Sequence, residues 1–112
     1  MNLEQVMQTA AAFADSADGS AWKSRELVLQ LLSLTPAPFS RHQYEPGHIT
    51  ATGLVLHPRQ RAVLLVHHRR LQRWLLPGGH VEEPDTEIAA TAFREVREET
   101  GAVLLVERGP LV

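Results

Sequence analysis

Apolar residues recur every three or four positions in two stretches of the first third of the chain, which is the spacing of one face of an α-helix. The first predicted helix covers residues 3–14, and its apolar face consists of Leu3, Val6, Met7, Ala10 and Ala14. Residues 15–20, which include Gly19, predict a break. The second predicted helix covers about residues 22–32, with an apolar face of Leu27, Val28, Leu31 and Leu32. We expect both helices to be packing elements that cover one side of the following domain or form a dimer surface.

The middle of the chain changes from helical spacing to nearly continuous apolar runs. Residues 35–47 contain three prolines and predict an irregular connection. The runs at 49–56 and 62–67 are separated by residues 57–61, which predicts a hairpin with a loop of about five residues. Because consecutive positions are apolar, we expect strands that helices bury on both faces. Residues 74–76 predict a third short strand, and residues 103–106 predict a further one.

A tight turn, a short acidic loop and a third helix are predicted between residues 77 and 101. Gly78 and Gly79 predict the turn, because glycine accepts backbone angles that other residues avoid. Asp85 or Thr86 is suited to cap the start of the helix, since its side-chain oxygen accepts from free N–H groups of the first turn. Gly101 is suited to a left-handed C-cap. The predicted inward face of this helix consists of Ile88, Ala89, Ala92, Phe93 and Val96.

Three glutamates form a patch beside that apolar face. Glu95, Glu98 and Glu99 are three or four residues apart, or adjacent, so their carboxylates converge on one side of the helix. Like charges at this spacing repel one another, whereas a hard divalent cation such as Mg²⁺ or Mn²⁺ prefers several oxygen ligands. Arg94 lies four residues before Glu98 and offsets part of the negative charge. The spacing alone is compatible with a metal site and with a solvated, charged helix face.

The residues from Gly79 onward resemble the Nudix box, a motif written G-x5-E-x7-R-E-U-x-E-E-x-G-U in which U is aliphatic. The run REVREETG at 94–101 matches the second half residue for residue, and Ala102 is a small apolar fit to the last position. Fourteen residues separate Gly79 from Arg94, where the motif has thirteen, so the loop carries one extra residue. Either Asp85 or Glu87 therefore stands for the first glutamate of the motif. The preceding WLLPGG at 74–79 is similar to the strand and turn that enter such a box.

The resemblance implies an α/β (α+β) fold, a Nudix-like α/β/α sandwich with a mixed sheet, preceded here by the two N-terminal helices. It implies a pyrophosphohydrolase that cleaves a diphosphate bond in a nucleoside diphosphate linked to another moiety. Glu95, Glu98 and Glu99 would hold Mg²⁺ or Mn²⁺, with the Gly79 carbonyl as a further ligand. Glu98, Glu99 and Arg94 would be the catalytic residues, Arg94 by orienting the carboxylates. The general base is one of the box glutamates or comes from the part of such a domain that follows this chain.

Two other functions are compatible with the same residues. One is a Nudix-like module that binds a nucleotide or regulates without hydrolysing it, which the altered loop spacing favours. The other is a structural or interaction protein in which the N-terminal helices mediate assembly. Metal-dependent phosphate release from a panel of substrates separates an enzyme from the first alternative, and specific metal binding by the glutamates counts against the second.

A basic stretch stands directly before the acidic motif. Arg69, Arg70 and Arg73 are predicted to bind substrate phosphates, because a guanidinium offers a rigid fork to phosphate oxygens, and the alternative is a solvated turn. His67 and His68 are adjacent on a predicted strand and point to opposite faces, which argues against a shared metal ion. Weaker candidates for substrate contact lie in the proline-rich connection, namely Arg41, His42 and Tyr44. Weaker candidates for metal binding lie in the box loop, namely His80 and Glu82.

Composition restricts the compartment and the partners. The 112 residues suffice for one domain, and 44% of them are hydrophobic, which is enough for a core. A net charge of −2 argues against a general nucleic-acid binder, which carries a basic surface. The chain has no cysteine, no signal-peptide pattern at Met1 and no apolar run near the ~18 residues of a membrane span. We therefore expect a cytoplasmic protein that acts on a small nucleotide-type molecule, with no nucleic-acid or membrane partner.

The resemblance divides the chain into two parts. Residues 1–46 are predicted to be a helical extension and linker, and residues 47–112 the N-terminal part of a Nudix domain with its box at 79–102. Nudix domains continue past the box helix with further strands and a helix, but only eleven residues follow Gly101. We therefore expect a C-terminally truncated domain, either a fragment or a domain completed by a second chain. An open sheet edge favours a homodimer.

Overall fold

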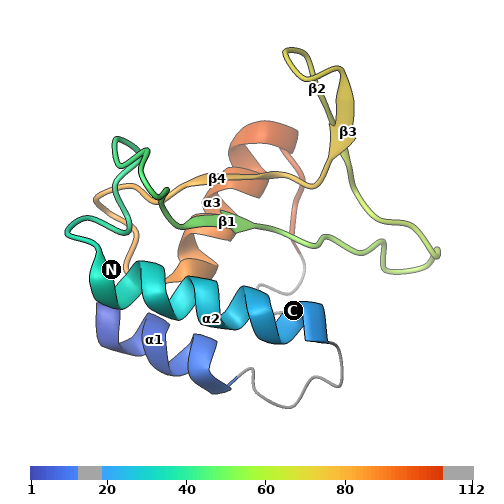
Figure 1. Ribbon diagram of the computed structural model, residues 1–112. Helices are drawn as coiled ribbons and strands as arrows, with labels where there is room; N and C mark the ends of the chain where they lie inside the picture. Colours follow the sequence, from blue (N-terminus) through green and yellow to red (C-terminus); the bar gives the residue numbers. More distant parts are fainter. Residues whose placement is uncertain (13–18, 105–112) are drawn as a thin grey trace.

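The computed structural model describes residues 1–12 and 19–104 of the chain (Figure 1). Its elements in chain order are α1 (Leu3–Ala12), α2 (Gly19–Leu34), β1 (Thr50–Thr52), β2 (Val66–His68), β3 (Arg73–Leu75), β4 (Gly78–His80) and α3 (Ile88–Thr100). Helices combined with small antiparallel sheets confirm the predicted α+β class. The predicted end of the first helix at 13–14 and the second half of the predicted strand at 103–106 lie outside the described residues, and residues 103 and 104 are not part of a strand.

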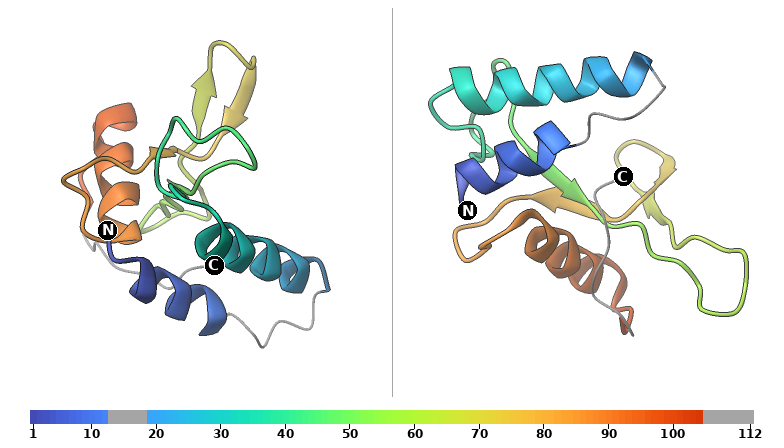
Figure 2. Two further views of the ribbon diagram at one scale, coloured as in Figure 1. Left: turned by 60° about the vertical axis from the view of Figure 1, so that its left-hand side comes forward. Right: turned by 90° about the horizontal axis from the view of Figure 1, so that it is seen from below.

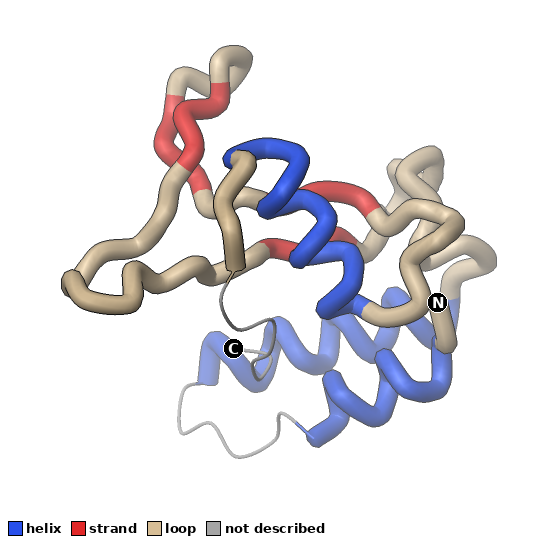
Figure 3. Tube along the Cα trace, turned by 180° about the vertical axis from the view of Figure 1, so that it is seen from behind, coloured by secondary structure: helices blue, strands red, loops and turns tan. Residues whose placement is uncertain are grey.

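β1 and β4 form a central sheet between two helical layers (Figures 1 and 2). The two strands are antiparallel, with Thr50 opposite His80 and Thr52 opposite Gly78. α3 packs against both strands on one side, as Figure 3 shows from behind, and the α1–α2 pair lies on the other side. A mixed sheet was expected, but every strand pair in the described residues is antiparallel.

The core is narrow and lies where β1 meets α3. Ala51 of β1 and Val96 of α3 are both buried, and Thr91 of α3 has no exposed surface. Gly53 follows β1 directly, and a Cβ at this position would overlap the side chain of Val96. The absence of a side chain at Gly53 therefore lets α3 pack closely on the strand.

The two N-terminal helices are confirmed, with different limits. α1 and α2 pack against each other, and Arg25 Nε of α2 donates to the carbonyl oxygen of Ala11 at 3.2 Å. α2 begins at Gly19, inside the predicted break, and runs two residues past the predicted end. Leu32 is buried as expected, but Leu27 is exposed. Leu27 was placed on the wrong face because it lies about 100° around the helix from Val28, which faces inward.

The two apolar runs do not form the long strands that were predicted. β1 is confined to Thr50–Thr52 and pairs with β4, while the runs meet only at one bridge, Leu56 opposite Val63. Backbone bonds of 3.0 Å from His57 to Ala62 and from Leu64 to Val55 hold this narrow turn. Several apolar side chains on both runs are exposed. The prediction of strands buried on both faces is wrong, because the described helices cover only the β1–β4 sheet.

β2 and β3 form a separate antiparallel hairpin that projects away from the rest of the molecule (Figures 1 and 3). Val66 lies opposite Leu75, and His68 lies opposite Arg73. Gln72 closes the turn with a positive φ of 52°. The third strand was predicted at nearly the right place, one residue later than β3 is found.

The predicted C-cap of α3 is confirmed and its predicted N-cap is wrong. Gly101 adopts a left-handed conformation with φ of 67°, and its N–H donates to the Arg97 carbonyl at 2.9 Å. The N-cap residue is Glu87, whose side chain makes no capping bond. Asp85 does not cap the helix, because its carboxylate turns inward and binds side chains of α3.

Candidate active site

A glycine strand brings the backbone against the glutamates of α3. The sequence predicted a tight turn at Gly78 and Gly79, but both residues belong to β4 and pair with Thr52 and Ala51. A Cβ on Gly79 would overlap the carboxylate of Glu95. The strand passes directly beside that carboxylate, so a residue without a side chain fits at position 79. Close packing within a strand, and not a turn, therefore explains this glycine.

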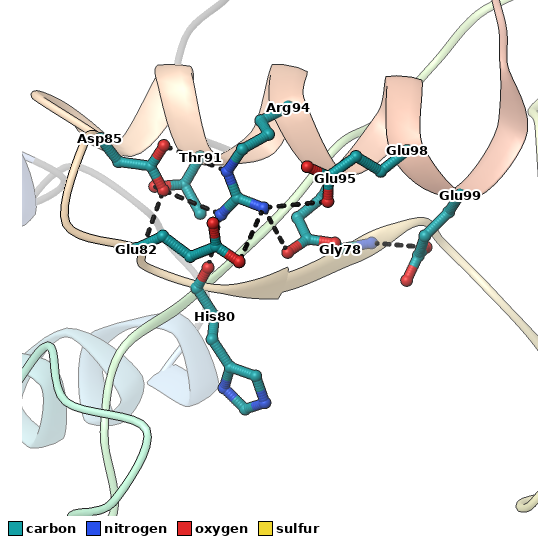
Figure 4. Close-up of polar contacts among 9 residues, drawn as sticks. All are labelled: Gly78, His80, Glu82, Asp85, Thr91, Arg94, Glu95, Glu98 and Glu99. Carbon is teal, nitrogen blue, oxygen red and sulfur yellow. Dashed lines mark hydrogen bonds and ion pairs between the residues drawn. The ribbon is translucent and has the colours of Figure 1, made fainter.

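The three box glutamates differ in their surroundings (Figure 4). The Glu95 side chain is 13% exposed and lies against β4, whereas the Glu98 side chain is 56% exposed. Glu99 accepts a hydrogen bond from the backbone N–H of Gly78 at 3.2 Å. One carboxylate is therefore enclosed, one faces solvent, and one is tied to the start of the glycine strand.

Arg94 connects the glutamates to the loop before α3. Its Nη1 lies 2.9 Å from Glu95 Oε1 and 3.2 Å from Glu98 Oε2, and 3.6 Å from Glu82 Oε1. Its Nη2 donates to the carbonyl oxygen of His80 at 2.8 Å. One guanidinium thus gathers three carboxylates and a β4 carbonyl, and it partly neutralises the repulsion that their negative charges create.

Asp85 holds Arg94 from the opposite side. Its two carboxylate oxygens accept from Arg94 Nε at 3.1 Å and from Nη2 at 2.8 Å, a bidentate pairing that fixes the guanidinium plane. They also accept from the Thr91 hydroxyl at 3.0 Å and the Glu82 N–H at 2.9 Å. The hydrogen bond from Arg94 lowers the pKa of Asp85 to about 2, and the same bond raises the pKa of Arg94. Asp85, 5% exposed, is therefore the loop acid that faces inward, while Glu87 is exposed.

A comparison with protein families matches residues 47–111 to the family described as NUDIX domain. The chain belongs to the Nudix family. Proteins with a Nudix domain are in general hydrolases, so membership in the family supports a hydrolase of this type. No curated protein and no solved structure matches the chain. Among the described residues, no helix is long and apolar enough to cross a membrane.

The Nudix glutamates suit a hard divalent cation in their chemistry. Carboxylate oxygens and a backbone carbonyl are the ligands that Mg²⁺ and Mn²⁺ prefer, and the approach of Gly79 to Glu95 places both kinds side by side. Glu95 and Glu98 already converge on one cationic group, Arg94 Nη1. In the part of the chain that the structure describes, no three acidic or histidine side chains are arranged as a complete metal site. Metal binding by the box glutamates stays a prediction.

The predicted substrate-binding arginines lie on the projecting hairpin. Arg69 and Arg70 lie in its turn and Arg73 begins β3, and all three are exposed. Within residues 1–12 and 19–104, no hydrogen bond or ion pair joins them to the box glutamates. The ring of His67 packs edge-on against Trp74 with 5.0 Å between centroids, and His68 Nδ1 accepts from the Leu71 N–H at 3.1 Å. Phosphate binding by the arginines stays a prediction.

The structure pairs His80, a weak candidate in the sequence, with His48, for which the sequence made no prediction. His48 Nε2 lies 3.0 Å from His80 Nδ1, and His48 Nδ1 lies 3.0 Å from the carbonyl oxygen of Gln43. Burial, Arg41 and His48 lower the pKa of His80, in that order, and Glu95 opposes them. Of the other weak candidates, Arg41, His42 and Tyr44 are exposed, and Glu82 contacts Arg94. Residues 32 positions apart give no local pattern, so the pairing had no sequence signal.

Proposed function

We propose that this Nudix domain is a Mg²⁺- or Mn²⁺-dependent hydrolase that cleaves a diphosphate bond in a nucleoside diphosphate linked to another group. The observation that carries the proposal is the convergence of the α3 carboxylates on one point beside the glycine strand, held there by Arg94. A helix selected only for stability would not maintain three acids at this spacing, because they repel one another.

Each box residue has a separate role in this proposal. Glu95, Glu98 and Glu99, with the Gly79 carbonyl, would hold the cation. When bound, the metal ion supplies charge neutralisation for the diphosphate and lowers the pKa of water. Arg94 orients Glu95 and Glu98 through its hydrogen bonds, and turnover depends on that orientation.

The proton of the attacking water goes to a box glutamate. We assign this role to Glu98, because its side chain is 56% exposed and can meet a water molecule, even though its Oε2 accepts from Arg94, whereas the Glu95 side chain is enclosed. The exposed Arg69, Arg70 and Arg73 contact the phosphates or the leaving group as the substrate extends toward the hairpin.

The test is hydrolysis of a panel of nucleoside diphosphate derivatives with Mn²⁺, using wild type, Glu98→Gln and Glu99→Gln. Each substitution keeps the side-chain shape and removes one charge, so we expect turnover to fall at least about a hundredfold while the fold is retained. Glu87→Gln is the matched control, since Glu87 is an exposed acid at the start of the same helix and makes no capping bond. Full metal-dependent activity in Glu99→Gln would refute the assigned roles.

A nucleotide-binding module without hydrolysis is the second candidate. Two observations favour it, namely the extra loop residue and the lack, among the described residues, of a complete metal arrangement. Under this alternative, wild type binds a nucleotide in equilibrium dialysis but forms no nucleoside monophosphate from the substrate panel with Mg²⁺ or Mn²⁺, and Glu98→Gln leaves the affinity unchanged.

A further inference from the structure

For two neutral rings, the His48–His80 contact determines which ring nitrogens carry hydrogen. A carbonyl oxygen only accepts, so His48 Nδ1 must donate to the Gln43 oxygen at 3.0 Å. In a neutral imidazole the other nitrogen then carries a lone pair, so His48 Nε2 accepts. His80 Nδ1 must therefore donate across the 3.0 Å contact, which leaves His80 Nε2 without hydrogen. The two rings form a directed chain of hydrogen bonds that ends on Gln43.

Gln43 is itself held firmly within the connection between α2 and β1. Its side-chain amide donates to the Thr35 hydroxyl at 3.0 Å and to the Gly47 carbonyl at 2.7 Å, and its oxygen accepts from the Ala37 N–H at 2.9 Å. The Thr35 hydroxyl continues to the Leu31 carbonyl of α2 at 2.6 Å. The connection at 35–47 is therefore irregular but internally bonded, and it provides a fixed support for His48.

His80 carries this support to the glutamates through its backbone. Its side chain points away from the carboxylates, as Figure 4 shows, while its carbonyl oxygen accepts from Arg94 Nη2 at 2.8 Å. Arg94 Nη1 in turn binds Glu95 and Glu98. Hydrogen bonds, linked through the covalent frame of His80, thus lead from Gln43, which lies outside the family match at 47–111, to the box glutamates.

We propose that His48 and His80 are positioning residues through which the N-terminal extension holds β4, Arg94 and hence the Nudix carboxylates in place. The consequence of this positioning for metal binding rests on the proposed function, whereas the hydrogen bond between the two rings does not. Removing the ring–ring bond leaves β4 held at residue 80 by its pairing with β1, so that the carbonyl that holds Arg94 can shift and Glu95 and Glu98 are less firmly placed. Residues 1–46 are then part of the active-site framework.

The first experiment reads the histidine rings directly in metal-free protein. A long-range ¹H–¹⁵N spectrum should show hydrogen on Nδ1 of both His48 and His80, with a scalar coupling across the shared hydrogen bond. Substitution of either residue assigns its signals. Hydrogen on Nε2 of His80, or loss of the coupling in wild type, would overturn the proposal whatever the enzyme does.

The second experiment compares two substitutions of His80 that differ in one donor. His80→Asn retains an N–H donor at the Nδ1 position, and His80→Leu removes it. We expect His80→Leu to weaken Mn²⁺ binding about tenfold and to lower kcat more than it changes KM, since outer-shell partners of metal ligands have effects of this order. His80→Asn should stay within about twofold of wild type by the same reasoning. His42→Leu, at an exposed histidine of the same connection, is the matched control.

The ¹⁵Nε signal of Arg94 separates failure of this inference from failure of the proposed function. Arg94 Nε donates to Asp85, so its signal is sensitive to the position of the guanidinium. It should shift in His80→Leu and not in His80→Asn or His42→Leu. If wild type binds no Mn²⁺, the proposed function fails and the Arg94 signal alone decides. An Arg94 signal unchanged in His80→Leu would refute the positioning role.

Discussion

At the residue scale, the site depends on one buried acid, Asp85. Its carboxylate accepts hydrogen bonds from the loop in which it lies and from side chains of α3. Asp85 accepts four hydrogen bonds, two of them from Arg94, so a single carboxylate fixes the guanidinium that collects Glu95 and Glu98. Removing one partner of such a pair leaves the other charge poorly compensated, which costs more than the pair itself contributes. The organisation of Glu95 and Glu98 therefore depends on a residue that is itself buried.

Asp85→Asn should destabilise the protein at pH 7 and progressively less as the pH falls from about 5 to about 2. The folded pKa of Asp85 is lowered to about 2 from an ordinary value of 3.8, so its charge stabilises fully above about pH 5, by roughly half as much at pH 3, and is lost as the pH falls through 2. The pH-dependent part is on the order of 1–2 kcal/mol, because solvent near the pair screens some of the charge interaction. Urea unfolding at pH 7, 4 and 3 measures the difference between variant and wild type.

Glu87→Gln serves as the control for this titration, because Glu87 is exposed and two residues from Asp85. Its unfolding free energy should follow that of wild type across the whole range. A constant difference between Asp85→Asn and wild type from pH 7 to pH 2.5 would mean that the charge of Asp85 contributes nothing, and only its shape matters.

At the element scale, the decisive contact is the approach of β4 to α3 and β1. Gly78 faces the strand backbone, where a Cβ would lie 2.6 Å from the Ala51 oxygen and 2.9 Å from Thr52 Cα. Gly79 faces the end of the Glu95 side chain. Backbone atoms of a paired strand cannot move aside, whereas a glutamate can change rotamer at little cost.

Gly78→Ala should therefore destabilise the fold by about 2 kcal/mol or more, and Gly79→Ala by about 1 kcal/mol or less. Gly79→Ala should nevertheless reduce Mn²⁺ binding as strongly as a substitution of Glu95, because it displaces that carboxylate. Gly19→Ala, in open space at the start of α2, is the control and should be neutral or slightly stabilising. Thermal melts with and without Mn²⁺ give both quantities, and equal stability losses at Gly78 and Gly79 would contradict this account.

The sequence predicted interactions between residues close together in the chain and missed those between residues far apart. The helices, the Gly101 cap and the box glutamates were found because spacing along one helix determines which residues share a face. The pairing of β1 with β4 and the contact of His48 with His80 were missed, since both join residues about thirty positions apart. Asp85 was assigned to a helix cap because its chemistry suits both roles, and only the folded chain shows that Arg94 competes for its carboxylate.

At the scale of the whole molecule, a well-bonded acidic centre stands beside much exposed apolar surface. Exposed apolar side chains lie on the segment that follows β1 and on the β2–β3 hairpin, namely Leu54, Leu56, Leu71 and Trp74. The buried hydrophobic residues that the structure describes are few, and they lie around β1, α2 and α3. Polar links between α3, β4 and the N-terminal connection therefore help to hold the site, and a ligand that binds there only in the native state raises the free energy of unfolding.

Mn²⁺ should raise the melting temperature of wild type and leave a Glu98→Gln/Glu99→Gln variant unchanged. A ligand at a hundred times its dissociation constant stabilises the native state by about 2.7 kcal/mol, which corresponds to roughly 10 °C for a domain of this size. Breaking the bonds of Glu98 to Arg94 and of Glu99 to the Gly78 N–H would weaken the affinity and raise the Mn²⁺ concentration at which this stabilisation is reached. Mg²⁺ should act in the same direction, because both ions take oxygen ligands. A rise in both proteins would place the metal elsewhere on the surface. No rise in either, with a cooperative transition in both, would leave Arg94 as the permanent counter-ion of the glutamates and favour a nucleotide-binding module over a hydrolase.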